Sequence, residues 1–466
     1  MNVVQSPQSS VDKPHILFAR TRAPRRKGMD GGGVTSVWLI DYLVAAGYRV
    51  SVLYLEMSQN GMDGYHEDER TQDRQNLLAM GVSDILPIPF PAVGKRPTIN
   101  LSLPHRVVNA IRNRLALRRR HIDVCENVAA AVHALKPDIC FVFSEVLEYF
   151  KSVKEVPCAA WLPHTGEPYR KIQIDLEWLT LLGSRWLGRV TYPLWLYCYQ
   201  RRLARLVKGL DGGLLPSFWY AKRYQDFCRP PPVFMACAHP AMDEAGDLTL
   251  PDPCAPPSNQ PFRVVLVGNL IQSLTSAGLA FLGDEIIPAL RRLGSLDRFE
   301  FVLIGKFEPR PDIAARLEGA NVRLAGYVDN LADEVNRADI VLHPVPYSPG
   351  AGVRLCSMAS MYPCFVLHAA VADSFEELRG SENCLVARTG DEFAAAMLHA
   401  CEDRALNSRL RQGARAAFDT HYRLDRFGPV LEDFLMKTID YCHDNGAPVA
   451  NDQVVKQRDR RQLTNQ

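Results

Sequence analysis

The stretch "YSPGAGVRLCSMAS", residues 347–360, has the composition expected at the mouth of a nucleotide site. It combines small residues with a single arginine, Arg354, and it leads from a hydrophobic segment into a predicted helix. A site that handles a sugar would also need carboxylates here, because carboxylates accept charge-assisted hydrogen bonds from hydroxyl groups. The stretch contains no acidic residue. The first question is therefore what chemistry a site of this composition could perform without an acid of its own.

Length, composition and charge exclude several classes of protein. A chain of 466 residues is too long for one ordinary core and predicts two or three domains. Its 47% hydrophobic and 23% charged residues are typical of a globular protein. The net charge of +2 gives no overall signal for nucleic-acid binding, so any basic surface must be local.

The twelve cysteines lie between Cys125 and Cys442 and include no CxxC pair. Several of them stand in apolar runs, which argues against a disulfide framework or a zinc site and favours a reducing cytoplasm. Residues 1–14 lack the apolar core of a signal peptide. No apolar run approaches the roughly 18 residues that would span a bilayer. We expect a protein located in the cytoplasm or at a membrane surface.

Hydrophobic runs alternate with helical patterns along the first half of the chain. Residues 15–20 predict a buried strand, Gly31–Gly33 open an amphipathic helix that ends at Gly47, and residues 49–55 predict the next strand. A strand–helix–strand unit of this kind predicts parallel pairing with a right-handed crossover. Further strands are predicted at 84–90, 137–144, 157–164 and 210–217.

A polar segment between Glu244 and Phe262 contains five prolines and predicts an interdomain linker. The strand–helix alternation then restarts, and two open α/β domains would hold a ligand between them at the carboxyl ends of their strands. The predicted organisation is an N-terminal domain at 1–243, a linker at 244–261, a C-terminal domain at 262–425, a C-terminal helix at 426–442 that could cross back, and a disordered tail at 443–466.

Four motifs of the second half occur in a recognisable order: residues 267–282 ("VGNLIQSLTSAGLAFL"), 301–309 ("FVLIGKFEP"), 321–367 and 383–418. Together they resemble the C-terminal domain of family 4 glycosyltransferases of the GT-B fold. The N-terminal half is consistent with this resemblance through "HILFAR…GGGVTSVW", "PHTGEP" and "LLPS". The resemblance implies an α/β protein with two doubly wound Rossmann-like domains facing each other across a cleft. It also implies transfer of a sugar from a nucleotide diphospho-sugar to an acceptor.

The resemblance places the nucleotide on the C-terminal domain and the acceptor on the N-terminal domain. A diphosphate leaving group develops negative charge, so cations and backbone N–H groups must face it. Lys306 and Arg354 are the best placed cations, and glycines let the backbone approach phosphate. Plain turn geometry explains any single glycine equally well, but explains all of them together less well. The expected donor-binding residues are Gly32, Gly33, Gly268, Asn269, Lys306, Ser348, Gly350, Gly352, Val353 and Arg354.

His164 and Glu167 follow an apolar strand in the loop "LPHTGEP". Polar loops at strand ends carry functional residues disproportionately in α/β folds. Relatives in this family have a histidine at a similar strand end that contacts the transferred sugar, so we interpret His164 as catalytic, against the alternative of a structural histidine. Glu167 is a candidate base or acceptor contact, and a solvated loop charge is the competing interpretation.

The family usually carries two glutamates, separated by seven residues, that hold the donor sugar and the ribose. One alignment places Ser348 and Cys356 at these two positions, and another, anchored on Arg354, places Ala359 at the second. A cysteine or an alanine cannot accept hydrogen bonds from two ribose hydroxyls as a carboxylate does, whereas Ser348 and backbone groups could substitute for the first glutamate. Three hypotheses follow: a divergent transferase with a different grip on its donor, an inverting enzyme whose base is Glu167, His164 or Asp30, or an inactive homologue.

Two basic segments lie on the expected acceptor side. Residues 105–121 hold six arginines and no acid, among them Arg112, Arg118 and Arg119, and residues 178–210 combine tryptophan and tyrosine with arginine. Such composition suits the interface of an anionic membrane. An ordinary helix with a solvated basic face is the competing interpretation, and no nucleic-acid motif accompanies the arginines.

From the sequence we expect a glycosyltransferase that acts on a saccharide or lipid-linked acceptor in bacterial surface polysaccharide or glycoconjugate biosynthesis. Its location would be cytoplasmic, with contact to the inner face of the cell membrane through the basic segments. No cofactor, metal or nucleic-acid partner is expected, because the nucleotide sugar is a co-substrate and cations can manage the diphosphate. The alternative functions are a catalytically inactive homologue that serves as scaffold or regulator, and a sugar-nucleotide epimerase on the same fold.

Overall fold

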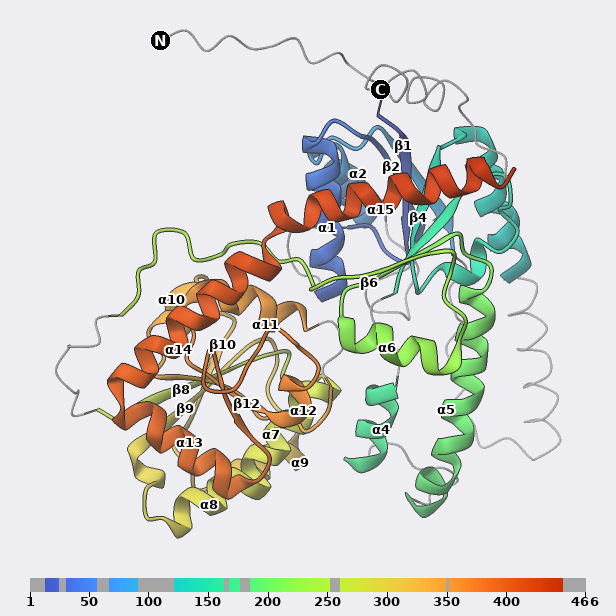
Figure 1. Cartoon of the computed structure of the whole chain (residues 1–466). Coiled ribbons are helices and arrows are strands. Elements are labelled where there is room, and N and C mark those ends of the chain that lie inside the picture. The colour runs from blue at the N-terminus through green and yellow to red at the C-terminus, as the bar shows by residue number, and fades with distance from the viewer. Residues whose placement is uncertain are drawn as a thin grey trace, which may run out of the picture.

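The computed structural model describes residues 13–24, 31–56, 67–90, 121–162, 167–176, 185–251, 260–348 and 352–446. These residues form two parallel β-sheets, each covered by helices on both faces (Figure 1). The N-terminal sheet has seven strands in the order β3-β2-β1-β4-β5-β6-β7, and the C-terminal sheet has six in the order β10-β9-β8-β11-β12-β13. The α/β fold class with two doubly wound domains is therefore confirmed.

The strands of the N-terminal sheet are β1 (His15–Arg20), β2 (Arg49–Glu56), β3 (Asp84–Pro89), β4 (Ile139–Phe143), β5 (Cys158–Trp161), β6 (Gly212–Leu215) and β7 (Val233–Ala236). The connecting helices include α1 (Gly31–Ala45), α2 (Glu67–Ala79), α4 (Glu167–Asp175), α5 (Arg185–Val207) and α6 (Phe218–Phe227). Residues 121–135 are also helical. Side chains of β1 alternate between two cores, with Ile16 and Phe18 on one face of the sheet and Leu17 and Ala19 on the other.

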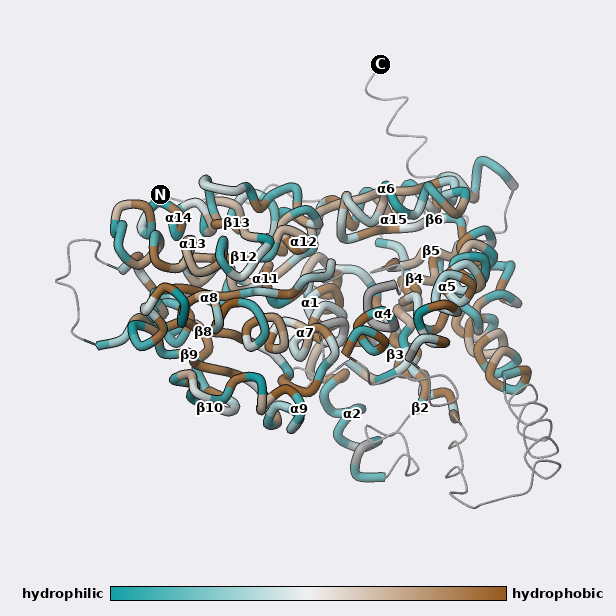
Figure 2. Tube along the Cα trace, turned by 90° about the horizontal axis from the view of Figure 1, so that it is seen from below, coloured by the Kyte–Doolittle hydropathy of each residue, from teal (hydrophilic) through white to brown (hydrophobic). Residues whose placement is uncertain are grey.

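The C-terminal sheet contains β8 (Phe262–Val267), β9 (Phe299–Ile304), β10 (Val322–Gly326), β11 (Ile340–His343), β12 (Phe365–His368) and β13 (Leu385–Ala387). Its helices include α7 (Ser273–Phe281), α8 (Ile287–Arg292), α10 (Leu331–Asn336), α11 (Val353–Met358), α12 (Ala369–Ala372), α13 (Gly390–Glu402) and α14 (Arg404–Ala417). The central strands are strongly hydrophobic, as expected for strands buried on both faces, whereas α2 at the edge of the N-terminal domain is hydrophilic (Figure 2).

The last helix, α15 (Leu424–Asp444), leaves the C-terminal domain and runs along the N-terminal one (Figure 1). Phe427, Leu431 and Phe434 on this helix are buried in the N-terminal core. Gly428 faces α1 so closely that a Cβ atom there would overlap the ring of Tyr42. The Glu432 carboxylate accepts hydrogen bonds from Tyr42 at 2.7 Å and from Tyr48 at 2.8 Å. The C-terminal helix is thus a structural part of both domains.

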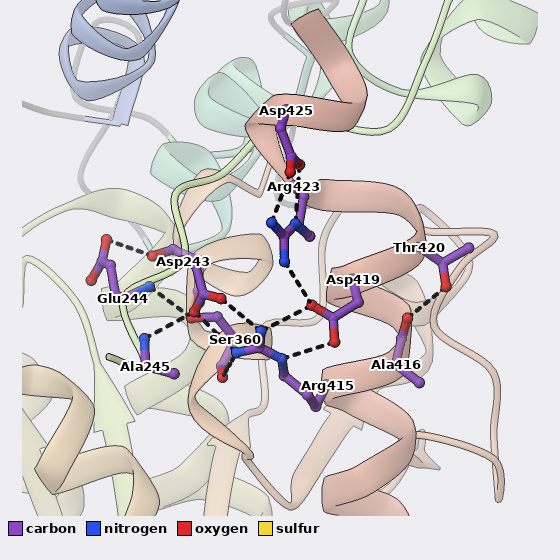
Figure 3. A network of polar contacts seen from close by, with 11 residues as sticks. Asp243, Glu244, Ala245, Ser360, Arg415, Ala416, Asp419, Thr420, Arg423 and Asp425 are labelled. Atoms are coloured by element: carbon purple, nitrogen blue, oxygen red, sulfur yellow. Dashed lines mark hydrogen bonds and ion pairs between the residues drawn. The ribbon is translucent and has the colours of Figure 1, made fainter. Parts of the chain in front are cut away.

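An ion-pair network joins the start of the linker to the region where α14 turns into α15 (Figure 3). Arg415 donates to the carboxylates of Asp243, at 2.6 Å, and Asp419, at 2.9 Å. Arg423 donates to Asp425 at 2.7 Å. Bidentate arginine–carboxylate pairs restrict orientation as well as distance. The network therefore fixes the two segments that cross between the domains, the linker and the start of α15, relative to each other.

Further contacts join the two domains near the carboxyl ends of the strands. Trp38 of α1 is buried in a core of the C-terminal domain, and Leu176, just after α4, packs against the other. Tyr220 of α6 and Ser348 share a hydrogen bond of 2.9 Å between their hydroxyl groups. Lys222 pairs with Glu376 at 2.7 Å. Both sheets therefore contribute to the same region.

We predict that Gly428→Ala destabilises the protein, because the added methyl group would force α15 away from Tyr42. Overpacking of this kind lowers the free energy of unfolding by about 1–3 kcal/mol. Thermal unfolding would show the effect as a lower Tm. Gly209→Ala is the matched control, since a Cβ atom at Gly209 meets only ordinary van der Waals contact. Equal Tm values for the two variants would contradict the close packing of α15 on α1.

Candidate active site

The strand order of the C-terminal sheet reverses between β8 and β11, since the chain turns to one side after β8 and to the other after β11. Ligands of doubly wound folds bind outside the carboxyl ends of the strands at such a point. Gly268 and Asn269 follow β8 directly, and residues 344–348 follow β11. The structure therefore brings Gly268, Asn269 and Ser348 to the two loops that border this switch point.

Glycines are required at three places around the switch point by the packing itself. A Cβ atom on Gly305 would overlap the carbonyl of Gly268, so the loops after β9 and β8 touch through their backbones. A Cβ atom on Gly268 would overlap Thr275 at the start of α7. Gly352 has φ +59° and abuts the ring of Phe375. These glycines build the loops, whatever the loops bind.

Arg354 on the first turn of α11 points back across the switch point. Its Nη1 atom donates to the carbonyl of Val267, at the end of β8, at 3.3 Å. The side chain reaches solvent, yet the surrounding protein desolvates it and lowers its pKa. Among the described residues Arg354 has no carboxylate partner. Its positive charge is thus available to an anion.

His343 stands at the end of β11, beside Arg354. Burial, together with the charge of Arg354, lowers the pKa of His343 to about 4, so the ring is neutral at pH 7. Its Nε2 atom is buried and has no hydrogen-bond partner in the described part of the chain. The sequence analysis did not single out this histidine, because it belongs to a segment whose other residues are hydrophobic and predict a buried strand.

Lys306 supplies a second cation at the end of the neighbouring strand β9. The side chain is exposed, and its Nζ atom lies 5.8 Å from the centre of the Tyr327 ring. Tyr327 follows β10 and is itself 73% exposed. Lys306, like Arg354, has no carboxylate partner among the described residues. Two cations without counter-ions therefore lie along the carboxyl edge of one sheet.

The missing carboxylates are not replaced by any acid on α11. Cys356 is 1% exposed and Ala359 is fully buried, so both candidate positions for the second glutamate point into the core. Burial, together with the charge of Glu377, raises the pKa of the Cys356 thiol well above its usual value. Glu377 is the buried acid of this region, and burial raises its pKa too. It accepts a long hydrogen bond of 3.5 Å from Tyr422 and does not reach an open surface.

Several predicted residues fall outside what the structure describes. His164, Gly350, Arg112, Arg118, Arg119 and Asp30 lie in undescribed segments. Glu167 is the first residue of α4, and Gly32 lies in the first turn of α1, which also contains Gly33 and leads to the buried Trp38. Val353 is half-buried and packs on the core beneath α11. The assignment of these residues to a site stays a prediction.

The N-terminal sheet has its own switch point, between β1 and β4, and sequence reasoning missed it. The buried guanidinium of Arg20, at the end of β1, pairs with Glu145 after β4 at 3.2 Å. Thr21 donates to the same carboxylate at 3.0 Å. Glu145 is 35% exposed at its side chain, so it is held in place but still accessible. The available signal was an acid directly after a buried strand, in "FVFSE".

No cluster of metal-ligating side chains occurs among the residues that the structure describes. Within the same residues, no helix has both the length and the apolar character needed to cross a bilayer.

Residues 261–403 match the family described as Glycosyl transferases group 1. This range begins just before β8 and ends just after α13, so it covers the loops that carry Lys306 and Arg354. No curated protein shows significant sequence similarity to the chain.

Solved structures share the fold of nearly the whole chain. A sucrose-phosphate synthase from Thermosynechococcus elongatus superposes with a TM-score of 0.61 at 13% identity, covering 92% of this chain and 100% of its own. A glycosyltransferase from Rickettsia africae gives 0.59 at 11% identity, covering 92% and 99%. Anabaena HepE in complex with UDP and glucose gives 0.58 at 12% identity, covering 90% and 99%. The resemblance to GT-B glycosyltransferases, and the assignment to this class of enzymes, are confirmed.

We predict that the stability of the protein falls as the pH drops from about 6.5 to about 4. Burial lowers the pKa of His15, His239 and His343 to about 4, so the unfolded chain binds protons in this range that the folded chain does not. Each such histidine contributes about 1.4 kcal/mol per pH unit to the slope. Replacing His343 by glutamine should flatten the dependence of Tm on pH between 5 and 6.5. The exposed His399→Gln is the control, and an unchanged slope in His343→Gln would contradict the burial of its ring.

Proposed function

We propose that this glycosyltransferase moves a sugar from a nucleotide diphospho-sugar to a saccharide or lipid-linked acceptor, in bacterial surface polysaccharide or glycoconjugate biosynthesis. The observation that carries the proposal is a pair of cations, Arg354 and Lys306, that have no carboxylate partner among the described residues and lie at the carboxyl edge of the sheet that matches the family. A diphosphate is the anion that such an edge of a doubly wound sheet suits best. The HepE structures with UDP and with UDP-glucose support the same ligand class.

The chemistry follows from where charge develops. As the bond between the sugar and the diphosphate breaks, negative charge accumulates on the leaving oxygen, and Arg354 and Lys306 would stabilise it. Asn269 and the backbone of the loops after β8 and β11 would hold the nucleotide. An acceptor hydroxyl requires a base on the N-terminal side, for which His164 and Glu167 are the candidates from the sequence and Glu145 is the carboxylate that the fold presents.

One observation favours a different function, that of a catalytically inactive homologue acting as a scaffold or regulator. Ser348 is hydrogen-bonded to Tyr220, and Cys356 and Ala359 are buried, so the C-terminal loop offers no carboxylate to a sugar. Such a scaffold would have no need to discriminate one nucleotide sugar from another. Selective nucleotide binding therefore separates the two functions.

We predict that one nucleotide family stabilises the protein in a thermal-shift panel of UDP, GDP, ADP, CMP and dTDP with their common sugars. A ligand at about 100 times its Kd adds about 2.7 kcal/mol to the free energy of unfolding. Arg354→Gln and Lys306→Gln should each weaken binding about tenfold or more, because each removes a charge-assisted contact. Lys437→Gln, on the far helix α15, is the matched control. If no ligand of the panel raised the Tm of the wild-type chain, the function as an inactive scaffold would be favoured.

The acceptor side includes α5, whose solvent-facing side is apolar at one end and basic at the other. Trp186, Val190, Leu194 and Tyr197 are between 53% and 68% exposed and recur at helical spacing. Arg201 and Arg205 continue the same face, and α5 contains no acidic residue. We propose that this face contacts an anionic membrane surface, where each basic residue contributes about 1 kcal/mol. The contact would deliver a lipid-linked acceptor to the N-terminal domain.

We predict that the protein co-sediments with phosphatidylglycerol vesicles but not with phosphatidylcholine vesicles. The double variant Trp186→Ser, Leu194→Ser should lose most of this binding, since it removes two of the exposed apolar side chains. Leu78→Ser combined with Leu293→Ser removes two leucines that are 56% and 57% exposed elsewhere on the surface and should have no effect. If the wild-type protein stayed in the supernatant with phosphatidylglycerol vesicles, the membrane proposal would be wrong.

A further inference from the structure

Helix α4 belongs to the N-terminal domain but lies over the switch point of the C-terminal sheet. It packs against α7, the helix that follows β8 (Figure 2). Its side chains also contact Tyr347 in the loop that follows β11. Leu176, next to its last turn, packs into a C-terminal core. The helix therefore contacts an element on each side of the switch point, namely α7 after β8 and the loop after β11.

Two charged side chains of α4 face the loop after β11. Tyr347 donates a hydrogen bond of 2.7 Å from its hydroxyl group to Oδ2 of Asp175. Lys171 lies one turn earlier on the same face, with its Nζ atom 5.8 Å from the centre of the Tyr347 ring. Both side chains are exposed, and Oδ1 of Asp175 accepts no hydrogen bond from the described residues. Asp175 thus keeps acceptor capacity for a ligand.

Asp175 lies beside a loop of the C-terminal domain that lacks a carboxylate of its own. Ser348, the residue after Tyr347, stands where one of the two alignments with the family places a glutamate, and its hydroxyl group is hydrogen-bonded to Tyr220. No acid lies between Tyr347 and Ser360. A carboxylate binds paired sugar hydroxyls through charge-assisted hydrogen bonds that a serine cannot supply.

We propose that Asp175, delivered by the N-terminal domain, is the carboxylate that binds the hydroxyl groups of the donor sugar. Tyr347 orients the carboxylate through one oxygen and leaves the other free. Lys171 offsets the repulsion between this carboxylate and a neighbouring diphosphate. This inference rests on the proposed function, because it assigns the sugar end of the same nucleotide-sugar site.

The test compares a nucleotide sugar with its parent nucleotide by calorimetric titration of the full chain. UDP-glucose and UDP are the first pair, or the pair that the thermal-shift panel selects. In Asp175→Asn the amide oxygen can still accept from Tyr347, so the interdomain contact stays while the charge is lost. We expect the affinity for the nucleotide sugar to fall about tenfold or more, with the affinity for the nucleotide unchanged.

Two further variants make the result specific. Asp226→Asn removes an exposed carboxylate from α6 of the same domain and should change neither affinity. Tyr347→Phe removes the hydrogen bond and keeps the carboxylate, so it should weaken nucleotide-sugar binding less than Asp175→Asn does. Equal losses for nucleotide and nucleotide sugar in Asp175→Asn, or no loss at all, would overturn the assignment of Asp175 while leaving the proposed function intact. Failure of the wild-type chain to bind any nucleotide would overturn both.

Discussion

Helix α15 buries Phe427, Leu431 and Phe434 in the N-terminal core although it is continuous with the C-terminal domain. Any rotation of one sheet against the other must therefore either carry this helix along or expose large aromatic side chains to water. Gly428 allows the helix to pack directly against Tyr42. The Glu432 carboxylate accepts hydrogen bonds from the hydroxyl groups of Tyr42 and Tyr48. The proposed site depends on this packing, because its candidate residues come from both domains.

The carboxyl edge of the C-terminal sheet carries positive charge that no neighbouring carboxylate of the described residues neutralises. Arg354 and Lys306 have no carboxylate neighbours among the described residues, and His343 stays neutral beside Arg354. A site that kept its two glutamates would balance part of this charge within one domain. Here Asp175 and Glu145 supply accessible carboxylates from the N-terminal domain, whereas the exposed Glu376 of the C-terminal domain pairs with Lys222. In the proposed site, donor binding would therefore be coupled to the alignment of the two domains.

The strand–helix alternation could be predicted from the sequence because strands buried on both faces read as short hydrophobic runs. β1, β2, β8, β9 and β11 were found in this way. β7 and β13 were not, since Val233–Ala236 directly follows three prolines and Leu385–Ala387 has only three residues. The cations Lys306 and Arg354 could be proposed because each directly follows a glycine-containing turn after a strand.

The acids of the site could not be predicted in this way. Asp175 lies 172 residues from its partner Tyr347, and Glu145 lies 125 residues from Arg20. The first pair forms only once the two domains have been placed, and the second only once β1 and β4 lie side by side in the N-terminal sheet. The place of Glu145 directly after a buried strand marks it as a candidate but does not reveal its partner. Glu377 was missed for a related reason, because its burial depends on the late turn that contains Tyr422.

The distribution of thiols has a practical consequence. Of the eleven described cysteines, nine are buried, Cys125 is partly covered, and Cys198 on the outer face of α5 is exposed. Burial raises the pKa of thiols such as Cys140 and Cys237 and keeps them protonated, so they react slowly with electrophiles. With Cys254, which lies outside the described residues, changed to serine, a maleimide dye would attach at Cys198. A polarity-sensitive fluorophore at that position would convert the environment of α5 into an optical signal in the intact protein.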